Sequence, residues 1–318
     1  MAARPSGPRD LALLGDRLEA LRRDWAARRL DSDPLEFARN AKLEDQEVVG
    51  FLAASLAFGR VASIRVSIQR ILDALEGSPA AFLDAWDERP IPSLKRFVHR
   101  WVTGRDVEDF LRRVRRARQA HGSLGALFAL GDEEEGEDFL EGKSARRGAS
   151  IESAAGSDYV PALNTFLRSL SSYAPPRSRP PSRGLRFLLP DPAAGSACKR
   201  QHLFLRWMIR TDGFDLGLWT GGRFTPSRLL LPMDTHVHRI ARYLGLTRRP
   251  SADLAASREA TVWLRWLNPE DPIAYDWALS RLGILAECVT ERTRRHCERC
   301  AIRPVCRASL VPVPGVAA

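Results

Sequence analysis

Apolar residues recur along most of the chain at intervals of three and four, which is the spacing of one face of an α-helix. Near the N-terminus this face is made of Leu11, Leu14, Leu18, Leu21 and Trp25. Further helices are predicted over residues 45–58, 63–77, 93–102, 106–120, 159–171, 198–210, 253–267 and 272–285. No alternation of apolar and polar residues is long enough to predict a sheet, so we expect an all-α protein.

Two stretches interrupt the helical pattern. Residues 131–158 have no period, and the span 131–160 holds nine acidic and three basic side chains, which predicts a disordered insertion. Residues 174–184 are rich in proline and arginine and predict an extended linker. The expected divisions are N-terminal helices that pack with the C-terminal lobe (1–44), a helical domain (45–230), a domain with a capping aspartate and a cysteine cluster (231–310) and a tail (311–318).

The stretch LLLPMDTHVHRIARYLGL, residues 229–246, combines a helix start with a candidate catalytic carboxylate. Asp234 stands directly before a helical pattern, where its carboxylate can accept backbone N–H bonds and feel the positive end of the helix dipole. Asp234 can therefore be a plain helix cap. A fixed, ionised carboxylate is also what stabilises the oxocarbenium character that develops when an N-glycosidic bond breaks, or what orients the attacking water.

Four cysteines crowd the C-terminal region with the spacing C-x8-C-x2-C-x5-C: Cys288, Cys297, Cys300 and Cys306. Four thiolates suit tetrahedral zinc or an iron–sulfur cluster. Structural zinc usually has two close cysteine pairs, whereas only Cys297 and Cys300 are close here, so we expect [4Fe–4S] with zinc as the alternative. Cys198 stands apart and is expected to be a packed core thiol.

The charge of the chain points to a polyanionic partner. The formal net charge is +10 and the sequence pI is about 10.0, which favours nucleic acid or an anionic membrane surface. The sequence contains no run of 18 apolar residues, so no membrane span is predicted, and the N-terminus does not resemble a signal peptide. We therefore expect a cytoplasmic protein, associated with the nucleoid if it binds DNA, and no membrane partner.

The region 229–306 resembles the helix-hairpin-helix DNA glycosylases, in their endonuclease III and MutY branch. In that superfamily a catalytic aspartate opens a helix in a V-D-T-H motif, and a later helix with a glycine near its end leads into four cysteines that hold [4Fe–4S]. MDTHVHRIARYLGL, Gly283 and the cysteine cluster match these elements, with a first cysteine gap two residues longer than usual. Residues 45–76 resemble the first helices of the superfamily's six-helix domain more weakly. The resemblance implies a two-lobed helical fold that binds damaged duplex DNA.

Two departures qualify the resemblance. The superfamily's hairpin reads like L-P-G-V-G-x-x-T-A, whereas the corresponding RTDGFDLGLWTGGRFTPSR has glycines in another pattern. Members with lyase activity carry a lysine about eighteen residues before the aspartate. Here Leu216 stands at that position, and residues 201–233 contain no lysine. The resemblance therefore implies a monofunctional glycosylase without the lyase lysine, or a protein that has lost the enzymology.

Several basic and aromatic residues are candidate DNA contacts. One predicted helix carries Lys199, Arg200, Arg206 and Arg210 with the stacking candidate Trp207, although Trp207 can equally be core and the charges a solvated rim. The polar side of the next helix carries His236 and Arg239, and the loop between the first two cysteines carries Arg292, Arg294 and Arg295, which a metal would order or which are simply solvated. Arg60, in a turn after an apolar helix, is a candidate to fill the gap left by an extruded base.

Three functions follow from these observations. The first is a DNA glycosylase that extrudes a damaged or mispaired base and uses Asp234 against its glycosidic bond. The second is a non-catalytic iron–sulfur or zinc protein that binds nucleic acid. The third is a metalloprotein whose basic surface serves another purpose, such as redox sensing.

Overall fold

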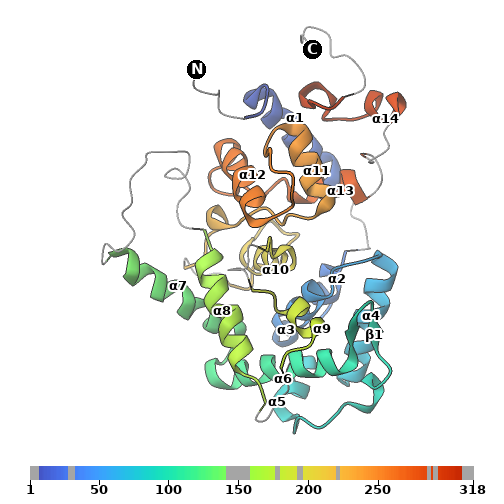
Figure 1. Cartoon of the computed structure of the whole chain (residues 1–318), viewed down its shortest axis with the longest axis vertical. Coiled ribbons are helices and arrows are strands. Elements are labelled where there is room, and N and C mark those ends of the chain that lie inside the picture. Colours follow the sequence, from blue (N-terminus) through green and yellow to red (C-terminus); the bar gives the residue numbers. More distant parts are fainter. Residues whose placement is uncertain are drawn as a thin grey trace. The chain divides into compact units, whose positions relative to one another are not determined.

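The computed structural model describes residues 7–27, 33–140, 158–175, 180–191, 196–219, 223–284, 288 and 293–309 (Figure 1). These residues are mostly helical, and the chain divides into two compact units. The first unit combines the described residues up to 27 with those from Thr225 onward, and the second combines those between 33 and Phe224. No described helix is long and apolar enough to cross a membrane.

The second unit is built around α3 (Leu43–Ser55). Its residues 48–55 are all buried, and the helix packs against α2 (Leu35–Arg39), α5 (Pro79–Ala85) and α10 (Lys199–Ile209). The ring of Phe51 lies 5.0 Å from that of Phe110 and 4.9 Å from that of Phe204. A side chain at Gly50 would approach Met208 to 3.0 Å, so this glycine lets α10 pack closely. The remaining helices of the unit are α4 (Val61–Ala74), α6 (Gly104–His121), α7 (Leu124–Leu140), α8 (Val160–Ser172) and α9 (Arg183–Leu188).

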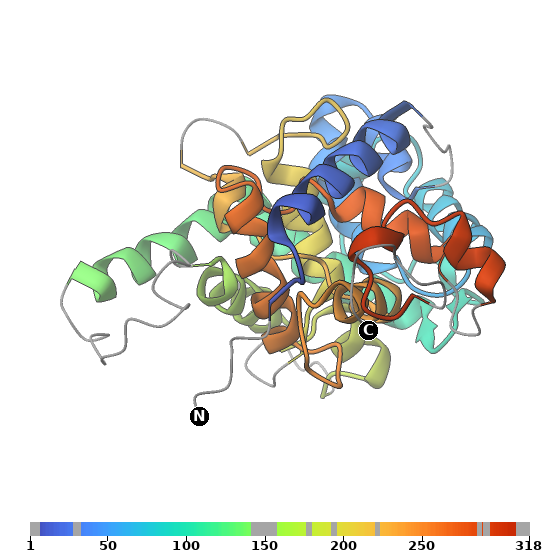
Figure 2. The same cartoon turned by 90° about the horizontal axis from the view of Figure 1, so that it is seen from above.

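The first unit places α1 (Leu11–Ala27) against α12 (Leu254–Leu267) and α13 (Asp276–Ile284) (Figure 2). Helix α11 (Thr235–Leu244) packs against the same two helices, and α14 (Arg294–Glu298) follows in the cysteine segment. Leu14 of α1, Ile240 of α11 and Leu279 of α13 are completely buried. The amphipathic pattern predicted for these segments is therefore the core of the unit.

One predicted helix is wrong. Residues 93–102 hold the end of a 3-10 turn, Pro92–Leu94, and then a short antiparallel hairpin of β1 (Val98–His99) and β2 (Val102–Thr103). Val98 pairs with Thr103, and His99 pairs with Val102. Arg100 turns the chain with a φ of 56°, a conformation that no helix contains.

The predicted boundaries of the irregular segments also need correction. Helix α7 continues to Leu140, so residues 131–140 of the expected disordered insertion are helical, and residues 141–157 lie outside the described part. Helix α9 starts at Arg183, inside the expected linker, because Ser182 caps it by accepting the Leu185 N–H at 3.0 Å. Helix α2 and the start of α3 belong to the second unit rather than to the expected N-terminal division 1–44.

Candidate functional site

Asp234 is the N-cap of α11. Its Oδ1 accepts the backbone N–H of His236 at 2.9 Å and of Val237 at 2.8 Å, and the residue is half-buried. The extended segment before it is fixed by α12, because the Leu231 N–H donates to Thr261 Oγ1 and the Leu231 carbonyl accepts from the Ser257 hydroxyl. The carboxylate is therefore held in one orientation by its own helix and by the next.

Helix α13 approaches the first turn of α11 so closely that only a glycine fits. A Cβ at Gly283 would lie 2.5 Å from the Cβ of His236. This close approach explains the glycine near the end of the predicted helix. It also gives His236, a predicted DNA contact, a packing role beside Asp234.

Arg239 lies one turn further along α11 and reaches the cysteine segment. Its Nη2 donates to the carbonyl oxygen of Cys288 at 2.5 Å and lies 3.5 Å from His236 Nδ1. One nitrogen of the guanidinium thus makes an internal contact, and the DNA contact expected of Arg239 stays a prediction. The C-terminal end of α11 also contacts this segment, because the Arg307 N–H donates to the Tyr243 carbonyl at 2.7 Å.

All four clustered cysteines line one pocket of the first unit. They share it with Tyr243, His296, Ile302, Arg303 and Ser309. Cys288 and Cys297 are buried, and Cys300 and Cys306 are half-buried. Burial raises the pKa of the Cys300 thiol to about 11, and the three neighbouring thiols add to this effect. Within the described residues, no three His, Cys, Asp or Glu side chains are arranged to hold a single metal ion.

The basic residues next to the cysteines are only partly described. Arg294 and Arg295 are exposed at the start of α14, as a phosphate contact requires, whereas Arg292 lies outside the described residues. His296 closes this turn as a capping box with Thr293, whose hydroxyl lies 2.8 Å from His296 Nδ1. That the arginines of this loop contact DNA phosphates therefore stays a prediction.

The basic face predicted for α10 is wrong for most of its residues. Arg206 and Arg210 are buried and bond the two carboxylate oxygens of Asp215 at 3.0 Å and 2.5 Å. Arg200 is also buried, and its guanidinium donates to the carbonyls of Ser55 and Phe187. Trp207, predicted to stack on a base, is completely buried. These side chains lie in the interior because α10 packs against α3 at the centre of its unit.

Lys199 and Arg60 differ from that group. Lys199 is half-buried in the first turn of α10, and Arg60 is exposed at the N-cap position of α4. Both predictions as nucleic-acid contacts remain open.

The glycine-containing stretch after α10 is not the hairpin of the resemblance. The backbone N–H groups of Leu216 and Gly217 both donate to the Trp207 carbonyl, at 2.9 and 3.0 Å, and the Trp219 N–H donates to the Met208 carbonyl. These amides serve the end of α10 and do not face outward to a phosphate. In the described residues between 210 and 234, only the short 3-10 turn Pro226–Arg228 follows, so this region lacks the second helix of such a motif.

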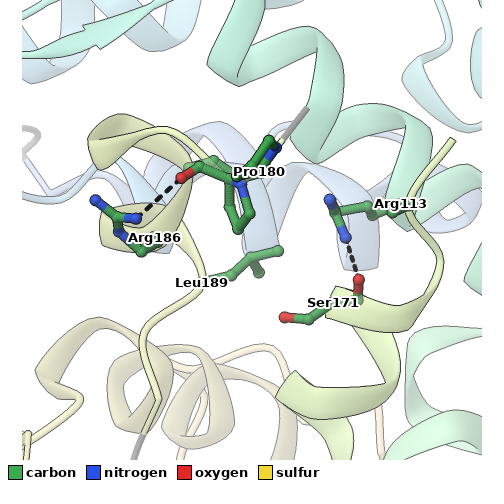
Figure 3. Close-up of a pocket in the computed structure, with 8 residues that line it drawn as sticks. Arg113, Ser171, Pro180, Arg186 and Leu189 are labelled. Carbon is green, nitrogen blue, oxygen red and sulfur yellow. Dashed lines mark hydrogen bonds between the residues drawn. The ribbon is translucent and has the colours of Figure 1, made fainter. Parts of the chain in front are cut away.

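A larger pocket lies in the second unit, between α6, the end of α8 and α9 (Figure 3). Arg113 lines it and donates to the Ser171 carbonyl, and Arg186 donates to the Pro181 carbonyl at 3.1 Å. Its other lining residues are Ala174, Pro180, Leu185 and Leu189. The described residues of its wall include no carboxylate, thiol or imidazole, so they offer no general base and no metal ligand.

Comparison with known proteins gives one match. No curated protein and no solved structure matches the sequence. Residues 33–285 match a family described as "Protein of unknown function (DUF2400)". The matched span contains Asp234, Arg239 and Gly283 and ends before Cys288. Because the match covers most of its length, the chain belongs to this DUF2400 family.

Proposed function

We propose that this protein binds damaged or mispaired DNA and cleaves the N-glycosidic bond of one base, with Asp234 as the key carboxylate. The observation that carries the proposal is the fixed position of Asp234 between α11 and the segment held by α12. An anion that cannot reorient is suited to the positive charge that develops on the sugar when the base leaves. The basic composition of the chain supports a polyanionic substrate.

In this proposal Asp234 has two tasks. Its first is to cap α11, which it does through Oδ1. Its second is to stabilise the oxocarbenium-like sugar or to orient the water that attacks it. Water forms the new C1′–O bond as the C1′–N bond breaks, and the proton that the water loses balances the departing base. No covalent bond to the protein forms, because residues 201–233 offer no lysine for a Schiff base.

We propose further that Cys288, Cys297, Cys300 and Cys306 hold a [4Fe–4S] cluster. Four thiols around one pocket match the ligand set of such a cluster. Four thiolates on one zinc ion must all lie about 2.3 Å from it, whereas a four-iron cluster binds each thiolate to a different iron and spreads them further apart. The wide spacing of Cys288 and Cys306 from the close pair Cys297 and Cys300 is the observation that supports the cluster over zinc. Its contribution would be to order the exposed Arg294 and Arg295 and to fix α11 through Cys288.

A second candidate function, nucleic-acid binding without catalysis, is favoured by the stretch after α10. Its amides at Leu216, Gly217 and Trp219 are used inside the unit, so they give no backbone anchor for the phosphate next to an extruded nucleotide. The two functions share the DNA and the metal centre. They differ only in what Asp234 does.

The test is base release from duplex oligonucleotides that carry a panel of damaged or mispaired bases, read as abasic sites that alkali cleaves. Asp234→Asn and Asp234→Ser both retain an N-cap acceptor, so each should fold and bind DNA but lose at least a hundredfold in turnover. Asp253→Asn is the matched control, because Asp253 caps α12 in the same way and accepts the Ala256 N–H at 2.8 Å. Wild-type protein that binds the duplexes but releases no base would establish the non-catalytic function instead.

A further inference from the structure

Three stretches of the chain that contain no acidic residue meet in the second unit. They are residues 48–72, 89–105 and 159–190, and each holds arginines. Helix α4 of the first stretch contacts β1 of the second, and α9 of the third contacts β2. A region assembled from such stretches presents positive charge that no neighbouring carboxylate in the sequence offsets.

One aromatic ring from each stretch lies at this meeting point. The ring centroids of Phe58 and Phe187 are 4.6 Å apart, those of Trp101 and Phe187 are 4.9 Å apart, and those of Phe58 and Trp101 are 5.5 Å apart. All three residues are half-buried, so none of them is completely enclosed in the core. A cluster of this kind on a surface is unusual, since large rings normally complete the core.

Arginine guanidinium groups accompany these rings. Those of Arg100 and Arg183 lie over Trp101, at 5.4 and 5.3 Å from the ring centroid, and both residues are exposed. Arg60 follows Phe58 closely in the chain and is exposed too. Within the described part of the chain, none of these three arginines forms an ion pair with a carboxylate. Their charge is therefore available to an anion from outside.

Buried hydrogen bonds fix the backbone segments that carry these rings and arginines. His99 is buried, with Nδ1 2.9 Å from the Ser67 hydroxyl and Nε2 2.9 Å from the Phe58 carbonyl. Because a carbonyl only accepts, Nε2 carries the proton and Nδ1 accepts from Ser67. Asp106 is buried as well and binds the Thr103 N–H at 2.7 Å and the Ser182 hydroxyl, which joins the hairpin to the start of α9. The hairpin and the start of α9, which carry Trp101 and Arg183, are thus fixed before any partner binds, which lowers the entropic cost of binding.

We infer that this surface, made of Phe58, Arg60, Arg100, Trp101, Arg183 and Phe187 and called the Trp101 surface below, binds single-stranded nucleic acid. Phosphates would pair with the exposed guanidinium groups, and an unpaired base would stack on a guanidinium plane or on the accessible face of a ring. A duplex keeps its base faces stacked internally, so the aromatic part of the surface favours unpaired nucleotides. The inference shares with the proposed function only the class of partner, and it does not depend on the chemistry of Asp234.

The test is fluorescence anisotropy of the full chain with a labelled single-stranded oligonucleotide of twelve thymidines and with a labelled duplex of equal length. We expect tighter binding of the single strand. The double variant Arg100→Ser/Arg183→Ser should weaken that binding at least tenfold and flatten its dependence on salt. Trp101→Leu should weaken it about tenfold with little change in the dependence on salt, because it removes stacking rather than charge.

The matched control is Arg22→Ser/Arg23→Ser, which removes two exposed arginines of α1 that pair with Glu19. It should leave single-strand affinity within about twofold of the wild type, because salt screens charges that lie far from the bound strand. Equal losses in the control and the test variant, or equal losses for single strand and duplex, would overturn the assignment. Asp234→Asn should not alter single-strand affinity, so failure of the Trp101 surface and failure of the proposed glycosylase activity are distinguishable. Circular dichroism with thermal unfolding verifies that each variant is folded.

Discussion

Arg239 Nη2 donates to the carbonyl oxygen of Cys288 at 2.5 Å, and this bond joins the helix that Asp234 caps to the first of the four cysteines. A charged donor to a carbonyl in a half-buried place is worth more than an ordinary hydrogen bond. Arg239 is thereby placed as a positioning residue between two parts of the candidate site. Replacing Arg239 should loosen the cysteine pocket more than it lowers the stability of the overall fold.

Replacing Arg239 by Gln should loosen the segment that carries Cys288. We expect the rate of metal loss to a chelator to rise severalfold, since groups behind the ligands of a metal typically change affinity by about ten- to a hundredfold. Arg242→Gln is the matched control, because Arg242 is exposed on the same helix one turn further on. Equal rates of metal loss in both variants would show that the Cys288 contact does not support the pocket.

The metal content of anaerobically purified protein tests the cysteine proposal directly. We expect about four irons and about four sulfides per chain, with an absorption shoulder near roughly 400 nm. Cys300→Ser should lower the iron content sharply, whereas Cys198→Ser should not, because Cys198 is buried in the other unit at the start of α10. A colourless protein with one tightly bound zinc per chain would replace the cluster by a zinc site.

The missing lysine predicts how the reaction intermediate behaves. If base release proceeds by direct hydrolysis, borohydride should trap no covalent complex between the protein and its DNA product. The measurement is a denaturing gel of protein incubated with substrate duplex and borohydride, with a lyase-active glycosylase as the positive control. A trapped band would place a lysine or the N-terminal amine in the chemistry and would refute the monofunctional mechanism.

The buried cluster around Asp215 should dominate the stability of the second unit. Complete burial raises the pKa of the Asp215 carboxyl to about 6, against the opposing effect of Arg206 and Arg210. Asp215→Asn removes the buried carboxylate that bonds both Arg206 and Arg210, so the free energy of unfolding should fall by about 3 kcal/mol. Asp212→Asn removes a more exposed carboxylate from Arg210 and should cost under about 1 kcal/mol. Chemical denaturation of both variants makes the comparison, and equal losses would contradict it.

His99 predicts a dependence of stability on pH. Burial lowers its pKa below the ordinary value of 6.5, so the unfolded chain binds a proton more readily than the folded one. The stability that His99 provides is complete above pH 6.5 and is lost as the pH falls below that value. The difference in unfolding free energy between wild type and His99→Gln should therefore shrink from pH 7.5 to pH 5. A difference that stays constant over this range would contradict the prediction.

Local signals in the sequence were sufficient for α11. Asp234 marks its start, the apolar face marks its buried side, and Gly245 ends it with a φ of 77°. The four cysteines were likewise close enough in sequence to predict a common pocket. In both places the residues that decide the structure belong to one short stretch of the sequence.

The basic face of α10 could not be interpreted from the sequence in the same way. An arginine on a helix gives the same pattern whether it meets water or a buried carboxylate, and Asp215 lies in an irregular segment after the helix. The Trp101 surface was missed because its three rings come from stretches more than forty residues apart in the chain. Contacts of this range become visible only when the chain is folded.

Helix α11 is held by the cysteine segment at two points, in its middle through Arg239 and Cys288 and near its C-terminal end through Tyr243 and Arg307. Such an arrangement obeys thermodynamic reciprocity: if metal in the pocket stabilises the position of Asp234, then a ligand that requires this position must tighten the hold on the metal by the same factor. Substrate analogues would then slow the release of metal. In that case the cysteine pocket and the carboxylate would take part in one coupled binding equilibrium.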